Sequence, residues 1–193
     1  QCGSLVGIEM ANAFAQWVLT FEQNLGSQQS DEYLQLIYQV VRKSWKPIRK
    51  FPEPSLVALR STINVCSFII INSGVPIEVR TASQILALLS SNTVLNDDVE
   101  MKRALAEDGP TLIRAIFRRV QNELMRPTIE ALAEVLFFYF KEFTTETRAV
   151  INEEQYGSSQ LVTAMFREIG NLRNFKQMTI RFNNAAIRDP GSI

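Results

Sequence analysis

The chain has 193 residues, of which 46% are hydrophobic and 21% are charged, so it can bury a sizeable core and is not typical of a disordered protein. Its 20 Lys and Arg residues balance its 20 Asp and Glu residues, so no overall positive charge draws it to nucleic acid or to an anionic membrane. Histidine is absent, which excludes Ser-His and Cys-His catalytic pairs and His-ligated metal sites.

The two cysteines, Cys2 and Cys66, are too few for a disulfide framework and too far apart for a Cys-x-x-Cys site. Cys66 is expected to be a small buried hydrophobe, and the low cysteine content favours an intracellular compartment. No apolar run approaches the ~20 residues of a membrane-spanning helix, and no signal peptide is visible. Because the chain begins with Gln-Cys-Gly rather than Met, we expect it to be a piece of a longer protein.

Helical periodicity runs through the whole chain. Apolar residues recur at intervals of three and four positions, the spacing that places them on one face of an α-helix. The groups in chain order are Phe14, Val18, Phe21 and Leu25; Leu34, Ile37, Val41 and Trp45; Leu56, Leu59, Ile63, Cys66 and Ile70; Ile77, Ile85, Leu86 and Leu89; Leu112, Ile113, Ile116, Phe117, Val120 and Leu124; Leu161, Val162, Met165, Phe166 and Ile169; and Leu172, Phe175, Met178 and Phe182. Since no convincing alternation with a period of two occurs, the sequence predicts an all-α protein.

Proline, glycine and aspartate mark the expected helix ends. Four prolines stand near expected first helical positions, where a missing N–H has no cost, namely Pro54, Pro76, Pro110 and Pro127. Five glycines are expected to end helices, namely Gly26, Gly74, Gly109, Gly157 and Gly170, while Asp31 and Asp108 are expected N-caps. Together with a polar stretch at 90–98, these breaks predict about nine or ten helices joined by short loops, and therefore successive antiparallel hairpins.

The distribution of apolar residues around two helices favours an open stack of hairpins over a closed bundle. The segment 129–143 is apolar nearly all round and must be covered on several sides, whereas the apolar residues of 111–124 occupy one narrow face. One broadly buried and one narrow-faced helix per hairpin is typical of stacked repeats. We therefore predict a single HEAT- or ARM-like α-solenoid segment over 1–193. Its clearest hairpins are expected at 54–90 and 108–143, with a C-terminal helical pair at 157–187.

No catalytic or nucleotide-binding motif is found. The chain lacks the GxGxxG, GxxxxGK[ST], GxSxG and HExxH patterns. The carboxylate pairs at 97–98, 107–108 and 153–154 are expected in breaks or at helix starts, where the helix dipole favours negative charge. The sequence therefore predicts no enzyme, no cofactor and no metal site.

The densest charged feature is the basic segment 42–50, which has five cations in nine residues: Arg42, Lys43, Lys46, Arg49 and Lys50. These side chains could contact phosphates, an acidic partner or the last carbonyls of the preceding helix, and they resemble a nuclear-localisation patch. The alternative is a solvated loop after a helix. Trp45 shares the apolar stripe of its helix and is expected in the core rather than as a platform for nucleic-acid bases.

Two further charged groups are candidate partner-binding surfaces. Arg114 and Arg118 share one helix face and could bind a carboxylate-rich surface, although a merely solvated face is the alternative. Glu130 and Glu134 form an acidic stripe that could bind basic cargo or could simply be the wet edge of a buried helix.

Five runs in the sequence are similar to those of one receptor family. They are VRTASQ at 79–84, EDGPTLI at 107–113, RPT at 126–128, SQLVTAMF at 159–166 and NLRNFKQ at 171–177. Together they resemble the late HEAT repeats of importin-beta-type (karyopherin-beta) nuclear transport receptors, and most of all the branch that contains importin-thirteen and transportin-SR. The resemblance covers 77–182, and the part before Pro54 is similar only in its helical character.

The resemblance implies a receptor that shuttles between cytoplasm and nucleus and carries protein cargo under control of the GTPase Ran. Such receptors hold Ran through N-terminal repeats, so this chain would be a C-terminal part that contributes cargo contacts. Contacts with nucleoporins are also implied, while contact with a membrane or direct binding of nucleic acid is not expected. Cargo contacts in this family follow no short motif, so the resemblance assigns no individual residue.

The alternative function is a stand-alone helical scaffold or an RNA-associated adaptor that uses the basic segment 42–50. The first helix is expected to distinguish the two, because a stand-alone solenoid needs polar capping helices. That helix contains Phe14, Trp17, Val18, Leu19 and Phe21. We expect these side chains to pack against an earlier repeat, as in the receptor.

Overall fold

The computed structural model describes residues 2–26, 30–96, 99–154, 156 and 159–188. Within this part of the chain the regular structure consists of nine helices and contains no strand. The helices are α1 (Cys2–Gln23), α2 (Ser30–Ile48), α3 (Pro52–Asn72), α4 (Pro76–Asn96), α5 (Val99–Asn122), α6 (Arg126–Glu142), α7 (Thr144–Glu153), α8 (Gln160–Arg167) and α9 (Leu172–Arg188). The all-α prediction is therefore confirmed.

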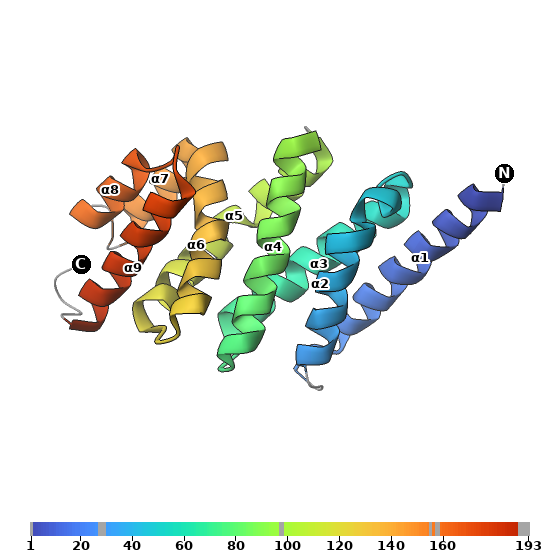
Figure 1. Ribbon diagram of the computed structural model, residues 1–193, viewed down its shortest axis with the longest axis horizontal. Helices are drawn as coiled ribbons and strands as arrows, with labels where there is room; N and C mark the ends of the chain where they lie inside the picture. The colour runs from blue at the N-terminus through green and yellow to red at the C-terminus, as the bar shows by residue number, and fades with distance from the viewer. Residues whose placement is uncertain (1, 27–29, 97–98, 155, 157–158, 189–193) are drawn as a thin grey trace.

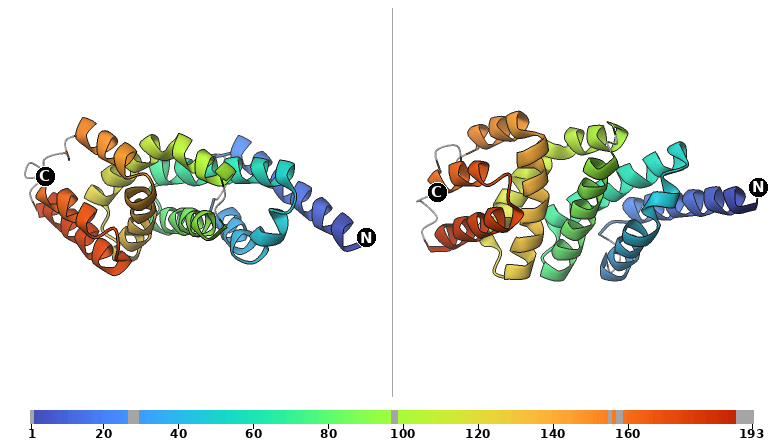
Figure 2. Two further views of the ribbon diagram at one scale, coloured as in Figure 1. Left: turned by 90° about the horizontal axis from the view of Figure 1, so that it is seen from above. Right: turned by 45° about the horizontal axis from the view of Figure 1, so that its top comes forward.

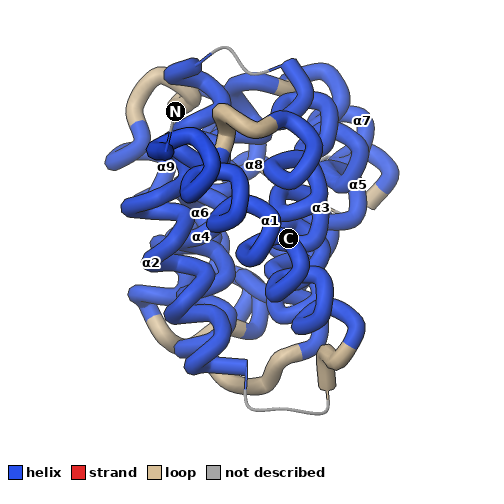
Figure 3. Tube along the Cα trace, turned by 90° about the vertical axis from the view of Figure 1, so that its right-hand side faces the viewer, coloured by secondary structure: helices blue, strands red, loops and turns tan. Residues whose placement is uncertain are grey.

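The helices form two layers (Figures 1 and 3). Helices α1, α3, α5 and α7 follow one another in the first layer, and α2, α4, α6 and α9 follow one another in the second. Each of α1, α3 and α5 also packs against the helix that comes next in the chain, and α8 packs against α9. Helices α1 and α9 lie at opposite ends of the stack (Figure 2). This arrangement is the predicted solenoid of antiparallel hairpins.

Helix α6 lies in the interior of the stack. It contacts α4 and α9 in its own layer and α5 and α7 in the other. Its buried side chains point in almost every direction around the helix axis, and Leu132, Val135, Leu136 and Phe140 are all fully buried. Each such side chain removed from water contributes about 1.5–3 kcal/mol. The segment 129–143 is therefore apolar nearly all round because four neighbouring helices pack against α6.

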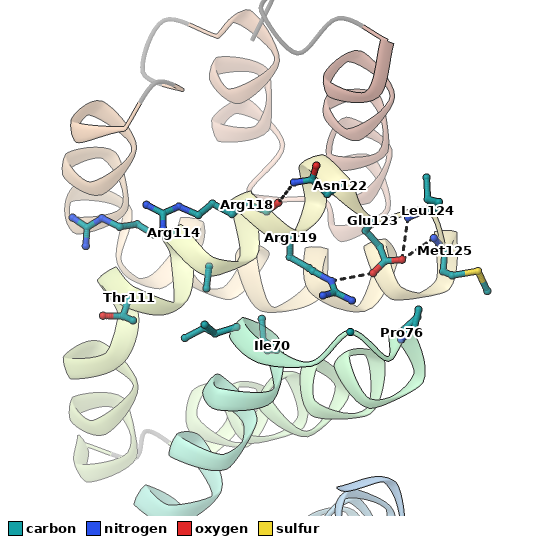
Figure 4. Close-up of a pocket in the computed structure, with 13 residues that line it drawn as sticks. Ile70, Pro76, Thr111, Arg114, Arg118, Arg119, Asn122, Glu123, Leu124 and Met125 are labelled. Carbon is teal, nitrogen blue, oxygen red and sulfur yellow. Dashed lines mark hydrogen bonds and ion pairs between the residues drawn. The ribbon is translucent and has the colours of Figure 1, made fainter. Parts of the chain in front are cut away.

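The predicted helix break at Asp108, Gly109 and Pro110 is wrong. These residues lie inside α5, which starts at Val99 rather than after Pro110, so Asp108 is not an N-cap. Proline has no N–H and its ring crowds the preceding turn, so it bends a helix that continues through it. Figure 4 shows α5 changing direction close to Thr111. The hairpin expected at 108–143 consequently has a longer first helix, divided by this bend.

The predicted break at 90–98 is wrong over 90–96, which form the end of α4, but most of the other predicted breaks lie where the sequence places them. Pro76 and Pro127 are the first and second residues of α4 and α6, and Gly26, Gly74 and Gly170 lie between helices. Gly26 has a φ of 89°, a left-handed conformation that favours glycine. Gly157 lies outside the described residues. Helix α2 starts at Ser30, so the predicted N-cap Asp31 is instead in its first turn.

Several large side chains of α1 pack against other residues of this chain. Phe14, Val18 and Phe21 are buried within this chain. The ring of Phe21 stacks on Tyr33 of α2 with centroids 4.5 Å apart, and Trp17 stacks on the same Tyr33 at 5.6 Å. Trp17 and Leu19 remain half-buried, but for Phe14, Val18 and Phe21 the expectation of packing against an earlier repeat is wrong. They close the first hairpin instead, so they do not distinguish the receptor from the adaptor.

Helix α3 is the only described helix that is long and apolar enough to cross a membrane by length and composition. The shorter apolar runs counted in the sequence did not indicate it. Of its most apolar 18-residue window, 56% is buried inside the molecule, against α1, α4 and α5. A core helix meets the same criterion, so packing in the stack accounts for this composition.

Candidate functional site

A groove with a volume of about 810 Å³ lies between α3 and α5. Figure 4 shows the second half of α5 along one wall, with the end of α3 and the α3–α4 turn along the other. We call it the α3–α5 groove. Thr111, Arg114 and Arg118 line one end of it, and Leu124 and Met125 line the other.

The basic end of the groove contains two of the predicted binding residues, Arg114 and Arg118. The guanidinium of Arg114 binds two carboxylates from the end of α7, through Nη2 to Glu153 and through Nε to Glu154 Oε1 at 3.1 Å. Arg118 Nη2 lies 3.7 Å from the same Glu154 oxygen, too far for a hydrogen bond. The sequence correctly placed the two arginines on one face, and the structure brings a carboxylate pair of this chain to them.

The middle of the groove has a buried link that the sequence did not reveal. Arg119 donates from Nη1 to the Ser73 carbonyl at 2.7 Å and from Nε to Glu123 at 3.2 Å. Glu123 is buried, and its second oxygen accepts the backbone N–H groups of Leu124 and Met125 at 3.0 and 2.9 Å. These bonds join the α5–α6 turn to the α3–α4 turn. The four-residue spacing of Arg119 and Glu123 was a signal for the pair, but nothing local indicated its burial or its contact with Ser73.

The apolar end of the groove is exposed. Leu124 and Met125 line it, Ile71 lines the α3 wall of the groove, and all three are among the exposed large hydrophobic residues of the chain. An ideal Cβ built on Gly74 meets no atom within 4 Å, so the groove is open above this glycine. The groove therefore joins an open apolar surface to a pair of arginines.

The basic segment 42–50 does not lie in the groove. Most of it is the last part of α2 rather than a loop after a helix. Arg42, Lys43, Lys46 and Lys50 are exposed, and none of the four has an ion pair within the described part of the chain. The fifth predicted residue, Arg49, is half-buried.

Trp45, in the middle of the basic segment, is buried as the sequence predicts, which removes it as a platform for nucleic-acid bases. The segment is therefore a cationic surface without an exposed aromatic side chain of its own.

The predicted acidic stripe is paired within the chain. Glu130 accepts from Arg126 Nε at 2.9 Å, one helical turn away on α6. Glu134 is paired with Lys176 of α9. The second pair joins α6 and α9, which are neighbours in one layer, so it stabilises the stack. It also leaves the Glu134 carboxylate already paired. Basic cargo would have to displace both partners to use this stripe.

The described residues contain no group of three or more His, Cys, Asp or Glu side chains that could hold a metal ion. Burial raises the pKa of the Cys66 thiol, so the thiol remains protonated and is a poor nucleophile at neutral pH. The features that could bind a partner are the groove, which has a basic and an apolar end, and the separate basic segment 42–50. Comparison with protein-family models, with curated proteins and with solved structures finds no match to this chain.

Proposed function

We propose that the chain is the C-terminal HEAT-repeat part of a Ran-dependent nuclear transport receptor of the importin-beta type, and that it binds protein cargo. The observation that carries the proposal is the continuous two-layer stack of antiparallel hairpins, an architecture whose extended surfaces bind other proteins. The similarity of the five runs between 79 and 177 to this family supports the same function. The receptor would act in both cytoplasm and nucleus, with Ran bound by repeats upstream of this chain.

The test uses the native polypeptide that contains this segment, isolated from cells with an antibody raised against it. We expect a polypeptide several times larger than 21.9 kDa. We also expect it to bind Ran loaded with a non-hydrolysable GTP analogue, but not Ran loaded with GDP, and to release its bound protein when Ran binds. A native size near 21.9 kDa, or a lack of nucleotide-dependent Ran binding, would overturn the proposal.

A second candidate function is an RNA-associated adaptor, which is favoured by four exposed cations of the basic segment 42–50 that form no ion pair with the residues that the structure describes. Each phosphate contact would lower the affinity as salt rises, with a slope of about 0.7 in log K against log salt for single strands. The test is a salt titration of RNA binding by the chain with Arg42, Lys43, Lys46 and Lys50 changed to Gln. A slope that falls by about three after this change supports the adaptor, and an unchanged slope argues against it.

A further inference from the structure

The α3–α5 groove is lined by three exposed apolar side chains, two of which, Leu124 and Met125, lie at one end. Leu124 is 80% exposed, and Ile71 and Met125 are about half exposed. A single exposed apolar residue is ordinary, but a cluster beside a cavity is typical of an interaction site. Arg119 and Glu123 hold the α5–α6 turn in place through their bonds to Ser73 and to the turn itself. The cluster is therefore held by the fold and does not have to form when a partner binds.

The other end of the groove has unused capacity to bind carboxylates. Arg118 is 68% exposed, and its only ion pair in the described chain is the 3.7 Å contact with Glu154. A guanidinium has five N–H donors and binds a carboxylate best through two of them. The pair of Arg114 with Glu153 is solvent-exposed on the glutamate side, and such pairs contribute only about 0–1 kcal/mol. An incoming carboxylate can therefore bind the exposed N–H groups of Arg118 and compete with Glu153 for Arg114, while Glu154 keeps its contacts with both arginines.

These two ends identify the chemistry of the occupant. We propose that the α3–α5 groove docks an extended segment of a partner protein in which acidic side chains lie next to aliphatic ones. The acidic side chains bind Arg118 and Arg114, and the aliphatic ones cover Leu124, Met125 and Ile71. A protein fits better than nucleic acid, because no aromatic side chain lines the groove for bases to stack on.

The inference deepens the proposed protein-binding function by naming the class of partner and its place on the molecule. It assigns a binding role to one predicted residue pair, Arg114 and Arg118, and none to the basic segment 42–50 or to Glu130 and Glu134. Its test involves neither Ran nor transport, so the groove and the receptor function can fail independently.

Three substitutions in the groove have matched controls elsewhere. Gly74→Trp fills the open apolar end, and Gly170→Trp is its control because a Cβ there also meets nothing within 4 Å. Arg118→Glu reverses the available charge, and Arg103→Glu is its control because Arg103 is 69% exposed and likewise forms an ion pair.

The third pair is Leu124→Ser, which removes the most exposed aliphatic side chain of the groove, and Val99→Ser, which removes one that is 72% exposed at the start of α5. All six positions are on the surface, so we expect every variant to keep the helical circular dichroism and the thermal midpoint of the parent chain.

The probe is a phage-displayed library of random 12-residue peptides selected on the whole 193-residue chain. We expect enriched peptides that combine Asp or Glu with Leu, Ile, Val or Met. We also expect each groove variant to weaken their binding about tenfold or more, the loss typical of a central contact, while the three controls bind as the parent does. Failure to enrich any peptide, enrichment of basic peptides, or equal binding by groove and control variants would overturn the proposal.

Discussion

At the scale of single residues, Tyr139 of α6 forms a buried hydrogen bond to the backbone of α5 near its bend. Its hydroxyl is buried and donates to the Leu105 carbonyl at 2.8 Å, one turn before the bend of α5. A Cβ on Gly109 would lie 3.0 Å from the ring of Tyr139, so glycine allows the ring to approach the backbone. Burial raises the pKa of the hydroxyl, which keeps its proton on the oxygen for this bond. Tyr139 therefore donates a hydrogen bond to α5 and also sets the distance between α5 and α6 at the bend.

Tyr139→Phe is expected to lower the free energy of unfolding by about 1 kcal/mol, because it removes a buried hydrogen bond to the backbone of α5. Urea denaturation followed by circular dichroism measures the change. The control is Tyr156→Phe, whose hydroxyl donates to the half-buried Gln121 side chain and can be replaced by water more easily. A smaller effect for Tyr139→Phe than for Tyr156→Phe would contradict this account.

Asp108 provides a pH-dependent prediction at the same scale. Its pKa is raised above 3.8 by burial and by the neighbouring Glu107, while Arg60 partly opposes the shift. A carboxyl whose folded pKa is raised stabilises the fold below its unfolded pKa, and this contribution is lost as the pH rises through the folded pKa. We therefore expect Asp108→Asn to be more stable than the parent chain at pH 7, with a difference that shrinks as the pH approaches 4.

Urea midpoints of both proteins between pH 4 and pH 7 check this prediction. A variant that is less stable than the parent at pH 7 would show that the attraction of Arg60 outweighs burial. Arg60 also forms a 3.1 Å ion pair with Glu107, so Asp108→Asn should leave that pair in place.

At the scale of elements, a side chain of α9 caps the C-terminal end of α5. The side-chain amide of Asn183 donates to the Val120 carbonyl at 2.6 Å and to the Glu123 carbonyl at 2.9 Å. The last carbonyls of a helix have no partner within the helix, and burial without a donor would be costly. Asn183 is buried and lies about 60 positions further along the chain, so α9 caps a helix of the other layer.

Asn183→Ala is expected to lower the free energy of unfolding by about 1–3 kcal/mol, because two carbonyls lose their donor in a buried place. The matched control is Asn174→Ala on the exposed side of α9, where the side chain donates to Glu168 in water. Thermal and urea denaturation of both variants measure the difference. Equal effects would mean that water replaces the amide at the end of α5.

At the scale of the whole molecule, stability depends on position along the stack. In a solenoid each hairpin contacts only its neighbours, so inner helices have partners on both sides and outer helices on one. Helices α4 and α6 each contact both flanking helices of their layer, whereas α1 and α8 lie at the ends of the contact pattern. The solenoid therefore has a gradient of local stability that a closed bundle would lack.

We expect backbone amides of α4 and α6 to exchange with deuterium more slowly than those of α1 and α8. Native-state hydrogen exchange read by mass spectrometry on the 193-residue chain measures this directly. Uniform protection across the helices would indicate a single cooperative unit rather than a stack of nearest-neighbour contacts.

The sequence by itself determined the helical class, the repeat-like alternation and the buried faces, because a period of 3.6 residues is a local property. Trp45 in the core of α2 and the apolar circumference of α6 are both of this kind. The Gly109–Pro110 pair was misleading because a helix ordinarily stops there, whereas α5 continues through it with the ring of Tyr139, thirty positions from Gly109, packed against the glycine.

Tertiary structure alone decided which surface is open. The carboxylates that reach Arg114 come from the end of α7, 39 and 40 residues further on, and the wall that faces α5 comes from α3. Phe21 packs on Tyr33, twelve positions further on, and not on an earlier repeat as the sequence suggested. Such pairings depend on how hairpins stack, and stacking is set by side-chain shape across helices rather than by any spacing along one of them.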